Sequence, residues 1–311
     1  MNRGDRTVIV ICGPTAVGKT AYAIETAKAC HGEIVSCDSM QLYQYMDIGS
    51  AKPTAEEQAQ VKHYLVDQID PAQPFSAAKY QTLAKAAIEE IFGKGKTPVI
   101  AGGTGLYLNA LLYDMDFSAP PGDPALRDEL YALAEAEGPE ALHLQLQQLD
   151  PGAADRIHPN NVKKVVRAVE AAKLGSKVGD FSSDLKPTSD YNAILIGLTR
   201  DRAELYDRIN RRVDLLMEAG LLDEVRWLLD MGLDEGDISM KGIGYKELIG
   251  YFHGRYDLEE AVDLVKKNTR HYAKRQLTWF KRYADMQWFN ISEYDSDAAC
   301  QEDIFQWLKN R

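Results

Sequence analysis

The sequence predicts an α/β protein in which helices flank a parallel sheet and an all-helical domain is inserted between two strands. Two observations support this fold class. Short apolar runs, each followed by a glycine-rich or polar turn, alternate with helical stretches. A long interval with only helical periodicity then separates the third apolar run from the fourth. The alternation of strands and helices at this spacing predicts parallel strands joined by right-handed crossovers.

Four apolar runs are the expected strands, and three helices precede the third of them. We expect the strands at residues 7–12, 33–37, 97–101 and 192–198. We expect the helices at residues 19–29, 55–64 and 77–92.

The interval after Tyr113 is expected to form the inserted domain. It opens with the proline- and glycine-rich stretch DMDFSAPPGDP. Helices are expected at 125–137, 139–149 and 161–174, followed by a segment containing Ser, Asp and Pro at 179–190. We therefore expect a helical insertion domain at 115–190 and a catalytic core formed by 1–114 plus 191–311.

The chain from Asp201 to its end is expected to be helical. Leu205, Ile209 and Val213 recur at four-residue spacing, which is typical of the buried stripe of a helix. We assign this stripe to the core and give it no function. The tail at 295–311 carries no motif, and we expect it to be a capping helix.

The charge balance limits the class of partner. Lys and Arg number 36 and Asp and Glu number 47, which gives a formal net charge of −11. A uniformly basic nucleic-acid coat is excluded, because the mean field of this chain repels phosphate. A local basic patch on an acidic body remains compatible with that charge.

Cysteine usage and hydropathy indicate a reducing, aqueous compartment. Cys12, Cys30, Cys37 and Cys300 form no CxxC pair, so buried reduced thiols are favoured over a metal site or disulfides. No apolar run approaches the roughly 18 residues that a membrane span needs. We expect a soluble, cytoplasmic monomer.

The strongest motif is GPTAVGKT, which follows the first strand and opens the first helix. It fits G-x-x-x-x-G-K-[ST], a phosphate-binding P-loop, in the context that this motif requires. Its N–H groups point at phosphate oxygens, Lys19 adds a positive charge, and the Thr20 hydroxyl can complete an Mg²⁺ shell. The expected diphosphate-binding residues are Gly13, Pro14, Thr15, Ala16, Val17, Gly18, Lys19 and Thr20. Because many enzymes share this loop, the reaction is left open.

Two further strand ends supply candidates beside the P-loop. Asp38 follows the second strand, at the edge where open α/β sheets hold their ligands. It could hold Mg²⁺ through water, cap a helix or act as a general base. The third strand ends in AGGTGLYL, where clustered glycines indicate either a turn or the close approach of a ligand.

Six segments then point to one family. GPTAVGKT, DSMQLYQYMDIGSAKP, AGGTGLYL, HPNNVKKVVRAVE, KGIGYKE and RHYAKRQLTWFKR occur in this order between about residues 8 and 290. Together they resemble the tRNA dimethylallyltransferases, also called tRNA isopentenyltransferases, in their bacterial form. The resemblance implies transfer of the dimethylallyl group of dimethylallyl diphosphate to N6 of adenosine 37 in tRNA, with Mg²⁺ as cofactor.

The resemblance also implies catalytic roles. Asp38 would accept the proton of the adenine N6, which is a poor nucleophile because its lone pair is delocalised into the ring. Thr104 would lie near the bridging oxygen of the diphosphate, and Arg212 would reach it from a helix. Lys19, the loop N–H groups and Mg²⁺ would stabilise charge on the departing diphosphate.

The tRNA is expected to contact basic and glycine-containing segments. Residues 266–282 hold seven Lys and Arg and no Asp or Glu, with aromatic residues interleaved, which favours an RNA-facing stripe over an ordinary solvated helix. The family pattern usually carries arginine at several positions near Lys163 and Lys164, so lysine here preserves charge without the fork of donors. The expected tRNA-contacting residues are Asp38, Ser39, Met40, Gln41, Thr104, Arg127, Lys163, Lys164, Arg167, Lys241, Gly242, Ile243, Gly244, Tyr245, Lys246, Arg270, Lys274 and Arg275.

Two other functions remain open at this stage. A small-molecule P-loop kinase would share the sheet, the loop and Mg²⁺, and Asp38 would then activate an alcohol. A non-catalytic RNA-binding switch would use nucleotide occupancy. A kinase does not need the basic segment 266–282, and a switch does not need a carboxylate aimed at the acceptor.

Overall fold

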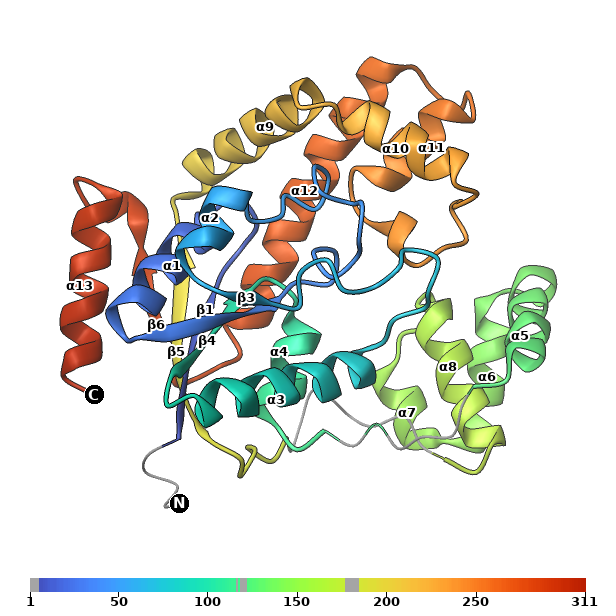
Figure 1. Cartoon of the computed structure of the whole chain (residues 1–311). Coiled ribbons are helices and arrows are strands. Elements are labelled where there is room, and N and C mark those ends of the chain that lie inside the picture. The colour runs from blue at the N-terminus through green and yellow to red at the C-terminus, as the bar shows by residue number, and fades with distance from the viewer. Residues whose placement is uncertain (1–5, 116, 118–121, 177–184) are drawn as a thin grey trace. The chain divides into compact units, whose positions relative to one another are not determined.

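The computed structural model describes residues 6–115, 117, 122–176 and 185–311 (Figure 1). Contacts divide the chain into two compact units. The larger unit comprises Met1–Tyr113 and Thr188–Arg311, and the smaller unit comprises Asp114–Pro187. In the part of the chain that the structure describes, no helix is both long and apolar enough to cross a membrane.

The larger unit is built on a parallel sheet with the strand order β3-β2-β4-β1-β5-β6. The strands are β1 (Thr7–Cys12), β2 (Gly32–Cys37), β3 (His63–Tyr64), β4 (Thr97–Gly102), β5 (Asn192–Thr199) and β6 (Gln287–Asn290). Cys12 and Cys37 both lie opposite Gly102 of the central strand β4. The loops after β1, β2 and β4 therefore start side by side at the carboxyl edge of the sheet, as in other open α/β folds.

Helices cover both faces of this sheet (Figure 1). They are α1 (Lys19–Ala29), α2 (Ala55–Gln60), α3 (Ala77–Gly93), α4 (Gly105–Leu112), α9 (Arg202–Glu218), α10 (Leu221–Asp230), α11 (Tyr245–Phe252), α12 (Leu258–Phe280) and α13 (Asp297–Lys309). Alternate strand residues point to opposite faces. Val8 and Val10 pack in one apolar cluster with α3, α4, α10 and α11, whereas Ile9 and Ile11 pack in another with α1, α9 and α13. The α/β prediction is thereby confirmed.

The smaller unit contains only helices among its described residues. They are α5 (Pro124–Glu137), α6 (Pro139–Leu149), α7 (Pro151–Arg156) and α8 (Val162–Lys173). The first three begin with proline, whose missing N–H costs nothing at a helix start. Leu142, Leu146 and Val165 are fully buried in a separate apolar cluster. Of the expected segment 179–190, residues 179–184 lie outside the described residues.

Two sequence predictions are wrong in the larger unit. The expected helix at 55–64 ends at Gln60, because the chain becomes extended at Val61 and then pairs with β2 as β3. The chain after Asp201 is not wholly helical, because β6 pairs with the edge of β5. Both strands are too short to carry a periodic signal of their own, and only pairing with a neighbour defines them. The capping helix expected in the tail is present as α13.

Candidate active site

The backbone of the P-loop is shaped to meet an anion between β1 and α1. Gly18 caps α1 with a φ of 112°, a left-handed conformation that favours glycine. A Cβ atom on Gly13 would lie 2.4 Å from the carbonyl oxygen of Leu198 on β5, so a larger residue would not fit. No side chain of the described residues caps the start of α1. The first N–H groups of this helix are therefore available to an anion.

Lys19 lies over this loop as a desolvated cation. Its Nζ donates a hydrogen bond of 2.8 Å to the carbonyl oxygen of Pro14. Burial lowers the pKa of Lys19 to about 8; the charge of Asp38 raises it, and the charge of Arg212 lowers it further. Lys19 therefore still carries its charge at pH 7, but it loses the proton more readily than an exposed lysine does.

Asp38 and Thr104 meet where β2 and β4 end. The amide of Met40 donates 2.9 Å to Oδ1 of Asp38, and the amide of Ser39 donates 3.1 Å to Oγ1 of Thr104. The amide of Thr104 itself donates to the carbonyl oxygen of Cys37, at 3.1 Å. These bonds fix the turn that follows β2 and bring two of the expected catalytic residues together.

Arg212 approaches the same place from α9. Burial lowers the pKa of Arg212, the charge of Asp38 raises it, and the charge of Arg208 lowers it. No ion pair joins Arg212 or Lys19 to a carboxylate among the described residues. The field of Asp38 therefore acts on two cations that form no ion pair of their own among the described residues, and Glu57 adds a further negative charge near Arg212.

Gln276 was missed as a site residue by the sequence analysis. It is 5% exposed on α12, and its Oε1 accepts a hydrogen bond of 2.8 Å from the amide of Thr15. Its Nε2 donates 2.9 Å to the carbonyl oxygen of Gly103. A Cβ atom on Gly103 would lie 2.3 Å from that Nε2. One buried amide thus joins the P-loop to the turn after β4, and the amide of Thr15 is occupied by protein.

The segment 241–246 packs against the loop that follows Asp38. A Cβ atom on Gly242 would lie 2.6 Å from Cε of Met40, so glycine permits this contact. Tyr245 is fully buried and donates 2.7 Å to Oε1 of Glu224. Gly244 is buried as well, whereas Lys241 and Lys246 are exposed. Because the side chain of Tyr245 is buried, it is not accessible to an RNA. It packs inside the protein beneath the loop that follows Asp38.

The basic segment on α12 divides into two faces. Lys274 and Arg275 are exposed. Arg270 is partly buried, and its Nη1 donates 2.5 Å to Oδ1 of Asn210 on α9. Lys266 pairs with Asp214 of α9 at 2.6 Å. Only part of this segment is thus free to meet phosphate, and Arg270 also joins two helices.

The smaller unit carries its own basic face on α8. Lys163, Lys164 and Arg167 are exposed, and they form no ion pair within the described ranges. Arg127 on α5 is different, because its Nε lies 2.9 Å from the buried carboxylate of Glu170. That pair also stabilises the start of α5, since Glu170 accepts 2.7 Å from the amide of Asp123.

Comparison with known proteins decides the family. A family model described as IPP transferase matches residues 41–283. The chain belongs to the IPP transferase family. It is 53% identical to the tRNA dimethylallyltransferase of Alkaliphilus oremlandii over 98% of this chain and 97% of that protein.

Two solved structures are similar to this IPP transferase family member over 98% of its length. The tRNA isopentenylpyrophosphate transferase of Bacillus halodurans is 44% identical, with a TM-score of 0.74 and 96% of that chain covered. A eukaryotic dimethylallyltransferase acting on tRNA is 27% identical, with a TM-score of 0.81 and 80% of that chain covered.

The oxygen donors beside the P-loop of this IPP transferase fit a magnesium ion whose coordination shell a substrate would complete. Thr20 has a hydroxyl with no protein hydrogen bond among the described residues, and Asp38 uses only Oδ1 for the turn. No group of three His, Cys, Asp or Glu forms a closed metal site in the described part of the chain. Mg²⁺ commonly takes one or two protein oxygens and fills its shell with phosphates and water. Thr20 is the residue that would hold it here.

The four cysteines of this family member are free thiols in the structure. Cys12, Cys37 and Cys300 are buried and Cys30 is partly buried. Burial raises the pKa of Cys37 to about 12, and the negative charge of Asp38 contributes to the rise. A thiol with that pKa is neutral at physiological pH, so Cys37 is a packing residue of the sheet.

Proposed function

We propose that this chain transfers the dimethylallyl group of dimethylallyl diphosphate to N6 of adenosine 37 in tRNA. The observation that carries the proposal is the position of Asp38 beside a P-loop, within the field of Lys19 and Arg212. A carboxylate suits an acceptor that must lose a proton, and the two cations suit a diphosphate leaving group. The name tRNA dimethylallyltransferase, which its relatives carry, supports the same reaction.

The site residues have separate roles in one nucleophilic substitution at C1 of the dimethylallyl group. The N6 lone pair forms a bond to C1 of the dimethylallyl group while the bond from C1 to the diphosphate oxygen breaks. Asp38 takes the N6 proton, and Lys19, Arg212 and the N–H groups that open α1 take up the charge on the diphosphate. Thr104 holds the turn beside Asp38 and faces the bridging oxygen. Mg²⁺ would add Lewis-acid stabilisation of that leaving group.

The RNA is held by two sets of exposed cations, each on its own unit. Lys274 and Arg275 on α12 and the cluster Lys163, Lys164 and Arg167 on α8 contact phosphates, which position an RNA without reading its sequence. Ser39, Met40 and Gln41 flank the target base, and Lys241 and Lys246 lie on the neighbouring segment. An unpaired base in a loop can leave its stack at the cost of a few kcal/mol.

A label-transfer assay tests this function against the kinase alternative. Protein, Mg²⁺ and unmodified tRNA are mixed with labelled dimethylallyl diphosphate or with γ-labelled ATP, and a tRNA with guanosine at position 37 is the matched control. We expect label in the adenosine-37 tRNA from the prenyl donor only. Label from ATP on a small alcohol, with none from the prenyl donor on tRNA, would replace this function with a kinase.

A further inference from the structure

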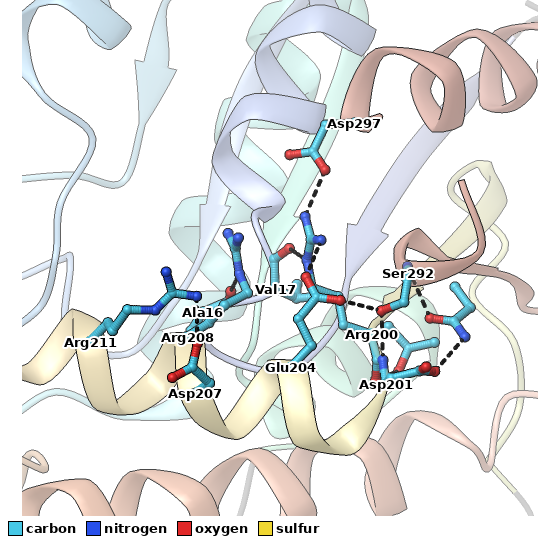
Figure 2. A network of polar contacts seen from close by, with 12 residues as sticks. Ala16, Val17, Arg200, Asp201, Glu204, Asp207, Arg208, Arg211, Ser292 and Asp297 are labelled. Carbon is cyan, nitrogen blue, oxygen red and sulfur yellow. Dashed lines mark hydrogen bonds and ion pairs between the residues drawn. The ribbon is translucent and has the colours of Figure 1, made fainter. Parts of the chain in front are cut away.

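Two consecutive carbonyl groups of the P-loop are held from outside by arginines (Figure 2). Arg208 of α9 donates from Nε to the carbonyl oxygen of Ala16 at 3.0 Å. Arg200, which follows β5, donates from Nε to the carbonyl oxygen of Val17 at 3.1 Å. These bonds lie on the outer side of the loop, and neither arginine was predicted to contact it.

Because each peptide group is planar, a hydrogen bond to its carbonyl oxygen also fixes the direction of its N–H group. In a trans peptide the C=O and the following N–H point in opposite directions. A bond that holds the carbonyl of Val17 toward Arg200 therefore directs the amide of Gly18 to the other side, at the start of α1. Ala16 has a φ of 64°, which is uncommon for a residue with a side chain and persists only where neighbouring contacts enforce it. The bond from Arg208 is such a contact, and the Val17 amide of the same peptide donates 3.4 Å to the carbonyl oxygen of Pro14.

The two arginines differ in how their charge is compensated. Arg200 is 8% exposed and bonds Glu204 at 2.7 Å and Asp297 of α13 at 2.8 Å. Ser292 extends this network by donating 2.5 Å to Glu204 (Figure 2). Arg208 has no ion pair with the described residues, and its charge reaches Arg212. The charge of Arg200 is thus compensated by two carboxylates, whereas among the described residues the guanidinium of Arg208 remains an unpaired positive charge beside the loop.

We propose that Arg208 and Arg200 are positioning residues of the diphosphate site. By holding the carbonyl of Ala16, Arg208 fixes the turn that the Val17 amide closes on Pro14, and by holding the carbonyl of Val17, Arg200 directs the Gly18 amide toward the anion. The proposal rests on the function proposed above in that the anion is the diphosphate of the donor. The network also ties the P-loop to α13 through Asp297, so the last helix contributes to the site from a distance.

The same helix provides a matched control. Arg211 lies three residues after Arg208, and its side chain is 67% exposed and pairs with Asp207 at 2.6 Å (Figure 2). It makes no hydrogen bond to the loop in the part of the chain described. Arg211→Met therefore removes the same charge from the same helix without touching the P-loop.

The test measures binding of inorganic diphosphate with Mg²⁺ by calorimetry, binding of tRNA, and the melting temperature. Arg208→Met is expected to weaken diphosphate binding about tenfold, in the range of one lost hydrogen bond from a charged group. Arg211→Met should leave it unchanged, and neither variant should alter tRNA binding by more than about twofold. Arg208→Lys should bind diphosphate more tightly than Arg208→Met, because an ammonium group can still donate to Ala16.

Three results would overturn the proposal. They are wild-type diphosphate affinity in Arg208→Met, equal weakening by Met and Lys, and equal weakening in the Arg211 control. If Arg208→Met does not fold, Arg208→Ala replaces it in the same comparison, where unchanged diphosphate affinity contradicts the proposal and a loss of about threefold or more supports it. Arg200→Lys repeats the test on the second arginine. Failure of prenyl transfer in the label assay, with diphosphate binding retained, would instead remove the proposed function alone.

Discussion

Charged side chains gather at both ends of the same sheet, but they are compensated differently. At the amino end, Glu33 of β2 is almost fully buried and accepts from Lys96 at 2.8 Å, from Lys94 at 3.1 Å and from the hydroxyl of Tyr64 at 2.9 Å. Burial raises the pKa of Glu33, but the bonds from Lys96, Lys94 and Tyr64 outweigh it and lower the pKa to about 2. Every charge in this cluster has a partner.

At the carboxyl end, the cations Lys19 and Arg212 are partly buried and form no ion pair with the described residues. Among the residues that the structure describes, the Lys19 ammonium bonds the carbonyl oxygen of Pro14 alone, and burial lowers the pKa of both Lys19 and Arg212. Desolvating a cation without an anion costs free energy, which the fold must supply from elsewhere. The amino end thus stabilises the fold, whereas the carboxyl end is held ready for a ligand that brings the missing negative charge.

The largest effect is expected from the carboxylate at the carboxyl end. Asp38→Ala should keep tRNA and donor binding and lose turnover by roughly 10²–10⁴-fold, the usual scale for a general base. Steady-state kinetics with both substrates saturating measures this loss. Near-normal turnover together with weak Mg²⁺ binding would show that Asp38 serves the metal and is not the base.

Variants of Lys19 and Thr20 are expected to distinguish the role of the lysine charge from the role of the metal ligand. Lys19→Ala should weaken donor binding and slow turnover together, by about 10²-fold, because its charge acts on bound and departing diphosphate alike. Thr20→Ala should raise the Mg²⁺ concentration needed for half-maximal rate. Identical Mg²⁺ dependence in the two variants would contradict this division.

The pH dependence of donor binding adds a check on Lys19. Because the pKa of Lys19 is lowered to about 8, the free protein loses this ammonium as the pH rises through 8. Donor affinity should fall in that range, and Lys19→Arg should abolish the fall because guanidinium stays charged. A decline that persists unchanged in Lys19→Arg would assign it to another group.

The sequence predicted the carboxyl end far better than the amino end. The P-loop, Asp38 and Thr104 follow strands directly, so local motifs identify them. Glu33 lies within an apolar run, and its partners come from segments about 30 and 60 residues away, so no local pattern marks them. Gln276, Arg200 and β6 were missed for the same reason, because only pairing across the fold gives each of them its role.

A moderate effect on stability is expected from the amino end. Glu33→Gln should lower the free energy of unfolding by about 2–3 kcal/mol, because two lysines lose a buried partner, and should leave turnover unchanged. Since folding lowers the pKa of Glu33 from 4.5 to about 2, its contribution is present above pH 4.5 and is lost as the pH falls toward 2. Urea unfolding at pH 7 and at pH 3 measures both, and a mutational loss as large at pH 3 as at pH 7 would contradict this linkage.

The smallest effect is expected at the exposed cations of α12. Replacing Lys274 and Arg275 with Ala should lower the log–log salt slope of tRNA binding by about 1.5, from roughly 0.7–0.9 per phosphate contact. Donor affinity measured without RNA should be unchanged. Arg270→Ala, which also breaks the bond to Asn210, should lower the melting temperature as well. A salt slope at the wild-type value in the double variant would remove Lys274 and Arg275 from the RNA surface.

The contrast between the two ends is tested most directly by two isosteric variants in one experiment. Asp38→Asn and Glu33→Gln each exchange a carboxylate for an amide on the same strand or just after it. Single-turnover prenyl transfer and thermal unfolding are measured for both, with donor and tRNA saturating. We expect Asp38→Asn to lose at least about 10²-fold in rate with no loss of melting temperature, and Glu33→Gln to lose stability while keeping the wild-type rate. A normal rate in Asp38→Asn, or a large rate loss in a folded Glu33→Gln, would contradict it.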